Sequence, residues 1–172
     1  MISFAELESA APPIAAFFAE RIGKTGLCLL GTTRSDGWPR VSPLEVFLHD
    51  GRIYMGSMPR AVKAKDLHRD GRCCVITPLA DKDDHGGEAK LFCRAREVDD
   101  RAEWEAVRAA FQERTGYDME EMGCAHLFEF GIEGAAWQRV EGGDTFRTSS
   151  WHPKREVREF GRTGSAGESV EL

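Results

Sequence analysis

The sequence predicts a mainly β fold with some helix, a split barrel of six to eight antiparallel strands with two or three flanking helices. Short apolar and β-branched runs recur along the chain, and turn residues such as Asp-Gly separate them closely. Strands do not alternate with crossover helices, as they would in a parallel sheet. Close spacing favours antiparallel pairing, and closing the sheet into a barrel removes exposed edges.

Length, charge and cysteine content limit the class of protein. The chain has 172 residues, of which 41% are apolar and 30% charged, and this is the globular range. Its net charge of −6 argues against general nucleic-acid binding, which needs a basic face. We therefore expect no nucleic-acid partner. The chain has no apolar run of about 18–20 residues and no basic leader, so we expect no membrane partner and a cytoplasmic location. The five cysteines lack CxxC spacing, so reduced thiols are expected.

The first 26 residues predict two helices. Ser3 and Glu6 have the spacing of a capping box. Pro12-Pro13 fits the first turn of a second helix, which we expect to end at Gly23. Its apolar face comprises Ile14, Phe17, Phe18 and Ile22.

The rest of the chain predicts strands, two more helices and a tail. The expected helices run from Pro59 to Arg69 and from a cap at Asp99 or Asp100 to Thr115. We expect residues 1–152 to form one domain, the charged segment 80–87 to be a solvated loop, and residues 153–172 to be a tail with an ordered start and a partly flexible end. The expected strands are Leu27–Thr33, Arg40–Leu48, Ile53–Ser57, Arg72–Leu79, Ala89–Val98, His126–Ile132, Ala135–Val140 and Thr145–Trp151.

The stretch from Arg40 to Leu67 carries the chemistry of a phosphate site. Ser42 and Ser57 supply hydroxyls, and the helix after Pro59 supplies backbone N–H groups and the ammonium of Lys63. These are the groups that a phosphate monoester needs. The simpler interpretation is a solvated arginine at a strand end and the polar face of an amphipathic helix, which holds best for Lys65.

Three segments in this order and spacing resemble the pyridoxamine 5′-phosphate oxidase-like family, the FMN-binding split barrels. They are LCLLGTTRSDGWPRVSPLEVF, GRIYMGSMPRAVKAKDL and EAKLFCRAREV. The resemblance covers residues 25–98 and, more faintly, 126–151. It implies a homodimer that holds FMN where the subunits meet, with Trp137 or Trp151 reaching the partner's flavin.

The resemblance also implies which residues bind the cofactor. Arg40, Val41, Ser42 and Pro43 match the strand along the flavin and its phosphate. Met55 and Gly56 match positions near the ring, Ser57 a small hydroxyl residue and Lys63 the phosphate lysine. Lys90 matches a position near the ring, although an ion pair with Glu88 explains it equally well.

Two positions depart from the oxidase pattern and change the expected substrate. Glu45 stands where the oxidase has a lysine that holds the substrate's phosphate, and Val62 stands where it has an arginine. Because a carboxylate repels a phosphate, we do not expect pyridoxamine phosphate as the substrate.

The expected function is therefore an FMN-dependent oxidoreductase acting on a small organic molecule. The alternatives are a deazaflavin-dependent reductase on the same fold and a non-catalytic flavin or haem binding protein, for which His68 or His126 would be guesses as haem ligands. No catalytic side chain is assigned, because the cofactor carries the redox chemistry. No metal ligands are assigned either, because no histidine has metal-pair spacing with another His or Cys.

Overall fold

The computed structural model describes residues 1–79, 86–164 and 167–172, which include four helices and ten strands. The expected loop at 80–87 lies mostly outside these residues. The helices are α1 (Phe4–Ala10), α2 (Pro12–Thr25), α3 (Val62–Arg69) and α4 (Arg101–Thr115). The strands are β1 (Leu27–Thr33), β2 (Pro39–Glu45), β3 (Phe47–His49), β4 (Arg52–Ser57), β5 (Arg72–Ile76), β6 (Glu88–Glu97), β7 (His126–Glu141), β8 (Thr145–His152), β9 (Arg155–Thr163) and β10 (Val170–Glu171).

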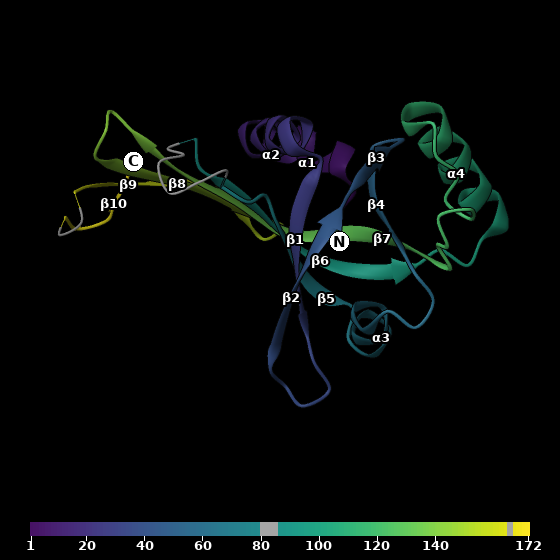
Figure 1. The fold of residues 1–172 in the computed structure, drawn as a ribbon. Coiled ribbons are helices and arrows are strands. Elements are labelled where there is room, and N and C mark those ends of the chain that lie inside the picture. Colours follow the sequence, from purple (N-terminus) through teal and green to yellow (C-terminus); the bar gives the residue numbers. More distant parts are fainter. Residues whose placement is uncertain (80–85, 165–166) are drawn as a thin grey trace.

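The strands form a single antiparallel sheet in the order β10-β9-β8-β7-β6-β5-β1-β2, and β4 joins it by pairing with both β7 and β3. In Figure 1, α1 and α2 lie on one side of the strands, α3 lies on the other, and α4 lies beyond β3 and β4. The long strands β7, β8 and β9 extend away from the barrel as an arm. The expected antiparallel split-barrel fold is confirmed, with more strands and helices than expected.

The N-terminal helices begin as the sequence indicates. Ser3 and Glu6 form the capping box of α1, and Pro12 opens α2. The expected end of α2 at Gly23 is wrong, because the helix continues to Thr25. Gly26 ends it with a left-handed φ of 65°, a conformation that glycine adopts without a steric penalty.

Two further expected boundaries are corrected by the backbone. Helix α3 begins at Val62 rather than Pro59, because Arg60 has a left-handed φ of 64° and Ala61 is extended. The two strands expected on either side of Glu133 are one strand, β7, in which the pairing with β6 shifts by one residue between Phe92 and Cys93. A bulge of this kind lets a strand continue while it bends.

The chain beyond residue 152 adds two strands to the sheet. β9 pairs with β8 and β10 pairs with β9. Ion pairs cross these strands, from Arg147 to Glu159 at 3.0 Å and from Arg158 to Glu171 at 2.6 Å. Such solvated strands lack an alternating apolar face, so their sequence is similar to that of a polar tail, which is what we expected for residues 153–172.

Two apolar clusters form the core. The larger lies between α1, α2 and the sheet, and the smaller packs α4 against β3 and β4 through Phe47, Tyr54 and Val107. Trp137 and Trp151 belong to the larger cluster and are 6% and 9% exposed. Both indoles are thus mostly covered by their own chain, and their expected approach to a partner's flavin stays a prediction. Among the described residues, no helix is both long and apolar enough to cross a membrane.

Candidate functional site

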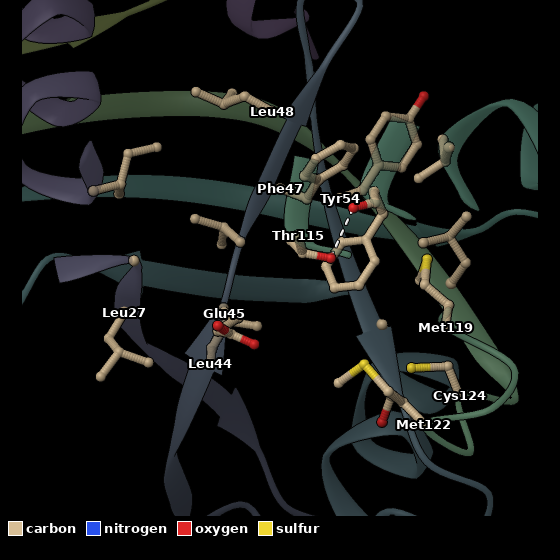
Figure 2. Close-up of a pocket in the computed structure, with 18 of the residues that line it drawn as sticks. Leu27, Leu44, Glu45, Phe47, Leu48, Tyr54, Thr115, Met119, Met122 and Cys124 are labelled. Carbon is tan, nitrogen blue, oxygen red and sulfur yellow. Dashed lines mark hydrogen bonds between the residues drawn. The ribbon is translucent and has the colours of Figure 1, made fainter. Parts of the chain in front are cut away.

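A cavity of about 790 Å³ opens beside the β3–β4 hairpin. Figure 2 shows its wall, to which β2, β3 and β4 contribute Leu44, Phe47 and Tyr54. The end of α4 and the segment after it contribute Thr115, Met119, Met122 and Cys124. Most of these side chains are apolar, so the cavity suits a flat organic molecule with few polar contacts.

Two polar side chains that line the cavity make no hydrogen bond with a side chain of the described residues. Ser57, the last residue of β4, is 3% exposed, and its buried Oγ makes no hydrogen bond with any described residue. Lys63, in the first turn of α3, is half-buried and donates from Nζ to the backbone oxygen of Pro43 at 3.3 Å. Burial lowers the pKa of Lys63. No carboxylate in the described part of the chain forms an ion pair with Lys63, so this charge is uncompensated.

Arg40 is not among the residues that line the cavity, and it pairs instead with Asp66 of α3. Its Nε donates to Oδ2 of Asp66 at 2.7 Å, and Asp66 also accepts from Thr32 at 3.0 Å and from Arg69 at 3.3 Å. Burial alone would raise the pKa of Asp66, but these hydrogen bonds outweigh it and the pKa is lowered. Asp66 follows Lys63 by three residues on α3, so both project from the same side of the helix.

Asp66 fixes Arg40 through Nε alone. Neither terminal nitrogen of the Arg40 guanidinium makes a hydrogen bond within the described residues. Since a guanidinium binds phosphate with paired N–H groups, this geometry leaves the Arg40 fork available next to α3.

Of the nine residues expected to bind a cofactor, four line the cavity and five do not. Pro43, Gly56, Ser57 and Lys63 line the cavity, whereas Arg40, Val41, Ser42, Met55 and Lys90 do not. Their role in binding stays a prediction.

Three of the residues outside the cavity have environments that explain their absence from its wall. Val41 is 67% exposed on β2, and Met55 is 1% exposed in the core. Lys90 lies on β6 opposite Ile76 and forms an ion pair with Glu88, as the simpler interpretation of that residue expected.

Sequence reasoning missed the wall that α4 and the following segment contribute. Phe111, Met119, Met122 and Cys124 lie more than fifty residues after β4, and no motif links them to it. The apolar stripe of α4 was visible in the sequence, but its packing partner was not. Periodicity shows that a helix has a buried face and does not show against what.

Comparison with known proteins identifies the architecture. A sequence model of the pyridoxamine 5′-phosphate oxidase family matches residues 14–139, most of the chain. A comparison with curated protein sequences finds no match.

Three solved structures share the fold. A protein from Clostridium acetobutylicum related to general stress protein 26, of the pyridoxinephosphate oxidase family, superposes with a TM-score of 0.59 at 14% identity, over 79% of this chain and 92% of that one. A haem binding protein from Mycobacterium smegmatis gives 0.63 at 19%, over 81% of this chain and 58% of that one. HutZ, the haem storage protein of Vibrio cholerae, gives 0.57 at 20%, over 72% and 90%. At these identities the likeness shows the fold alone.

Proposed function

The chain belongs to the pyridoxamine 5′-phosphate oxidase family, and we propose that it is an FMN-dependent oxidoreductase acting on a small organic molecule. One observation carries the proposal. The buried Ser57 hydroxyl without a partner and the uncompensated Lys63 ammonium line the same largely apolar cavity. A buried polar group without a partner costs about 1–3 kcal/mol, so such a pair is expected where a ligand supplies the missing partners.

The residues present fit the phosphate of FMN. A phosphate monoester offers three acceptor oxygens and a charge of about −1.5 to −2 near neutral pH. The Ser57 hydroxyl can donate to one oxygen, and Lys63 neutralises charge. Lys63 lies in the first turn of α3, and the N-terminus of a helix favours an anion. Asp66 holds the Arg40 guanidinium against α3, the helix that carries Lys63.

The cavity also fits the ring system. Its volume of about 790 Å³ lies within the range of about 300–1,000 Å³ that is usual for cofactor sites. Apolar side chains such as Leu44, Phe47 and Phe111 exclude water from the space that the ring would take. Bound FMN would supply the electron transfer, and the chain's own residues hold, orient and shield it.

Two polar side chains of the wall bear on the substrate. The Tyr54 hydroxyl donates to Glu103 at 3.0 Å, and burial together with this bond raises its pKa, so it stays protonated. Tyr54 is thereby unsuited to proton abstraction near neutral pH. Glu45 also lines the cavity, and its carboxylate disfavours an anionic substrate. A neutral or cationic organic molecule suits this cavity better than pyridoxamine phosphate.

We further propose that two copies of the chain assemble around the cofactor sites. Apolar side chains on and near β1 and β2 are exposed, including Leu27 at 49%, Trp38 at 69% and Val41 at 67%. Exposed apolar side chains spread along one hairpin, as here, can form part of an interface. Sedimentation of the purified protein gives the assembly state directly, and a monomer at micromolar concentration would contradict the proposal.

Titration of the cofactor-free protein with FMN and with riboflavin tests the proposed function. Both compounds carry the same ring, and only FMN carries the phosphate. Quenching of flavin fluorescence should show micromolar or tighter binding of FMN and markedly weaker binding of riboflavin. Equal binding of both would mean that Ser57 and Lys63 do not hold a phosphate. Tighter binding of a deazaflavin than of FMN would favour the deazaflavin reductase. Reduction of the bound flavin by a nicotinamide donor then separates an enzyme from a carrier.

Haem is a second candidate for the same cavity. Two relatives of this fold are described as haem binding or haem storage proteins. The cavity wall holds the sulfur atoms of Met119, Met122 and Cys124, and methionine and cysteine are known axial ligands of haem iron. His68 and His126 do not line it, which argues against either as the ligand in this cavity. Titration with haemin tests this candidate. A haem absorption spectrum that is lost when these sulfur-bearing residues are replaced, together with no binding of FMN, would favour haem over the flavin.

A further inference from the structure

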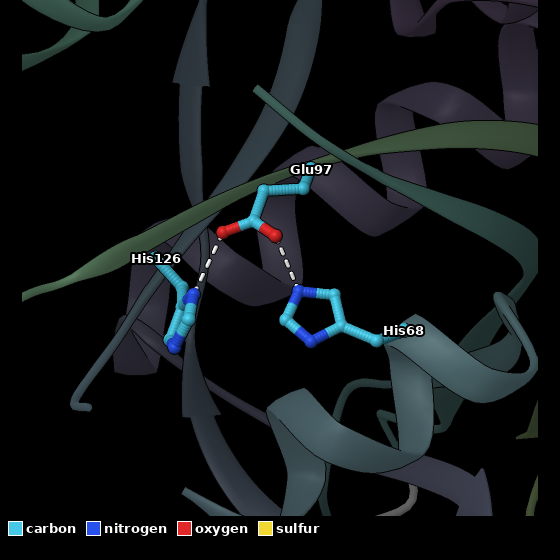
Figure 3. Close-up of side chains that lie close together, drawn as sticks. All are labelled: His68, Glu97 and His126. Carbon is cyan, nitrogen blue, oxygen red and sulfur yellow. Dashed lines mark hydrogen bonds and ion pairs between the residues drawn. The ribbon is translucent and has the colours of Figure 1, made fainter. Parts of the chain in front are cut away.

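Three side chains that are far apart in the sequence meet at one point beside the barrel. His68 comes from the last turn of α3, Glu97 ends β6 and His126 begins β7. Figure 3 shows the Glu97 carboxylate between the two imidazoles, with one oxygen directed at each ring. Sequence spacing had indicated no metal-ligand pair among the histidines. The three residues are 29 positions apart in each step, and only the fold brings them together.

The donor atoms are close enough to share one ion. Nδ1 of His126 lies 2.7 Å from Oε1 of Glu97, and Nε2 of His68 contacts Oε2. One ligand atom from each of the three residues lies within 4.8 Å of the others. Tetrahedral zinc with bonds of about 2.0–2.1 Å separates its ligands by about 3.4 Å. The contacts of both imidazoles with Glu97 are shorter than this separation, so both rings have to move away from the carboxylate to admit the ion. The His68 side chain is 41% exposed, which leaves it free to turn.

The surroundings hold the two rings in place. The imidazoles lie edge to face, with 5.2 Å between their centroids, and both contact the ring of Phe128, at 5.3 Å and 6.2 Å. The backbone of His126 pairs with Ser57 in the sheet. Two of the three donors are thus attached to strands of the barrel, and the third comes from α3.

Space and charge next to the cluster favour a cation. Glu97 also lines a second cavity, of about 390 Å³, whose wall includes Asp99, Asp100 and Glu120. This cavity gives water access to the Glu97 carboxylate, so that water can complete the coordination shell. Arg101 is the one basic residue among those that line it.

We propose that His68, Glu97 and His126 form a binding site for a divalent transition-metal cation of the zinc type, with water in the remaining positions. Two imidazoles and one carboxylate are a donor set that zinc and its neighbours in the first transition row accept. Because the ligands come from α3, β6 and β7, the bound ion fixes α3 to the sheet. The proposal does not depend on which organic cofactor the larger cavity binds.

Competition with a chromophoric chelator tests the site with Zn²⁺ as the probe. The full chain, freed of metal and kept reduced, should bind one Zn²⁺ per chain with micromolar or tighter affinity. His68→Gln, Glu97→Gln and His126→Gln should each weaken that binding about tenfold or more. His152→Gln is the matched control, because His152 is exposed on β8 and outside the cluster, and it should bind as the wild type does.

Two outcomes of the chelator titration would overturn the proposal. One is Zn²⁺ binding that is absent, or unchanged in the three Gln variants. The other is binding that depends on Cys124, which lines the second cavity and is tested by Cys124→Ser. The unmodified protein gives an independent result if a variant fails to fold. In its NMR spectrum, Zn²⁺ should change the chemical shifts of the ring nitrogens of two of the five histidines. In a thermal unfolding experiment, Zn²⁺ should raise the melting temperature. Shifts in none, or in all five, would also contradict the site.

Discussion

Replacing Lys63 by glutamine removes the charge that we assign to the cofactor phosphate while retaining most of the side chain's length. A hydrogen bond to a charged group contributes about 1.5–3 kcal/mol. Lys63 is half-buried and makes no ion pair with a described residue, so neither solvent nor a carboxylate screens it strongly. Lys63→Gln should therefore weaken FMN binding about 10–100-fold.

The stability of the cofactor-free protein should respond differently. Burial disfavours the charged form of Lys63, as its lowered pKa shows. Removing that charge should leave the free energy of unfolding unchanged or slightly increased. A lysine that served only the fold would give the opposite result, a loss of stability with no effect on FMN.

Fluorescence titration and urea unfolding of the same preparations measure both quantities. Lys65→Gln is the matched control, because Lys65 is exposed two residues further along α3 and does not line the cavity. Riboflavin binding provides a second control, since Lys63→Gln should hardly change it. If Lys63→Gln weakened FMN and riboflavin equally, or matched Lys65→Gln in every measurement, the assignment of Lys63 to the phosphate would be refuted.

Three further predictions follow from the same region. Because the pKa of Lys63 is lowered, FMN affinity should be constant between the second pKa of the phosphate, about 6, and the pKa of Lys63, and should fall as pH rises through the latter. Lys63→Arg keeps its charge and should show only the decline due to the flavin itself, so identical pH profiles would count against the mechanism. Asp66→Asn should lower the free energy of unfolding by about 2–4 kcal/mol in urea unfolding, because it leaves Arg40 and Arg69 without their buried partner. Asp70→Asn, which breaks a solvent-screened pair with Arg72, should lower it far less, and an equal loss in both variants would count against the buried network. FMN should protect Cys124 from a thiol reagent, because Cys124 lines the cavity, and should leave the rate at Cys74 unchanged; equal protection of both thiols would place the flavin elsewhere.

Local signals predicted the elements of the fold well where one short pattern determined the backbone. The capping box at Ser3, the proline start of α2 and the Asp100 and Gly116 caps of α4 are all observed. Strand β1 begins and ends where its apolar run does. Errors arose where a residue without a distinctive signal determined the outcome, as with the left-handed Arg60 before α3.

The strands after residue 152 show a different limit of sequence reasoning. β9 is stabilised by pairing with β8 and by ion pairs across it, such as Arg147 with Glu159. These partners are distant in the sequence, and neither face of β9 is apolar enough to show a period of two. A polar composition alone therefore does not distinguish such a strand from a tail.

The candidate site was predictable only in part, because some of its residues are close in the sequence and others meet only in the fold. The stretch from Arg40 to Leu67 supplied Pro43, Gly56, Ser57 and Lys63, and all four line the cavity. The Asp66 carboxylate that holds Arg40 and the sulfur atoms of the opposite wall required the fold. Long-range convergence also explains the cluster of His68, Glu97 and His126, which no local spacing indicates.

A crystal structure of the protein grown with FMN is the most direct test of the central claim. It should show one flavin phosphate per chain within hydrogen-bond distance of Ser57 Oγ and Lys63 Nζ, with the ring in the cavity beside Phe47. A phosphate bound elsewhere, with the Ser57 hydroxyl still without a partner, would contradict the account.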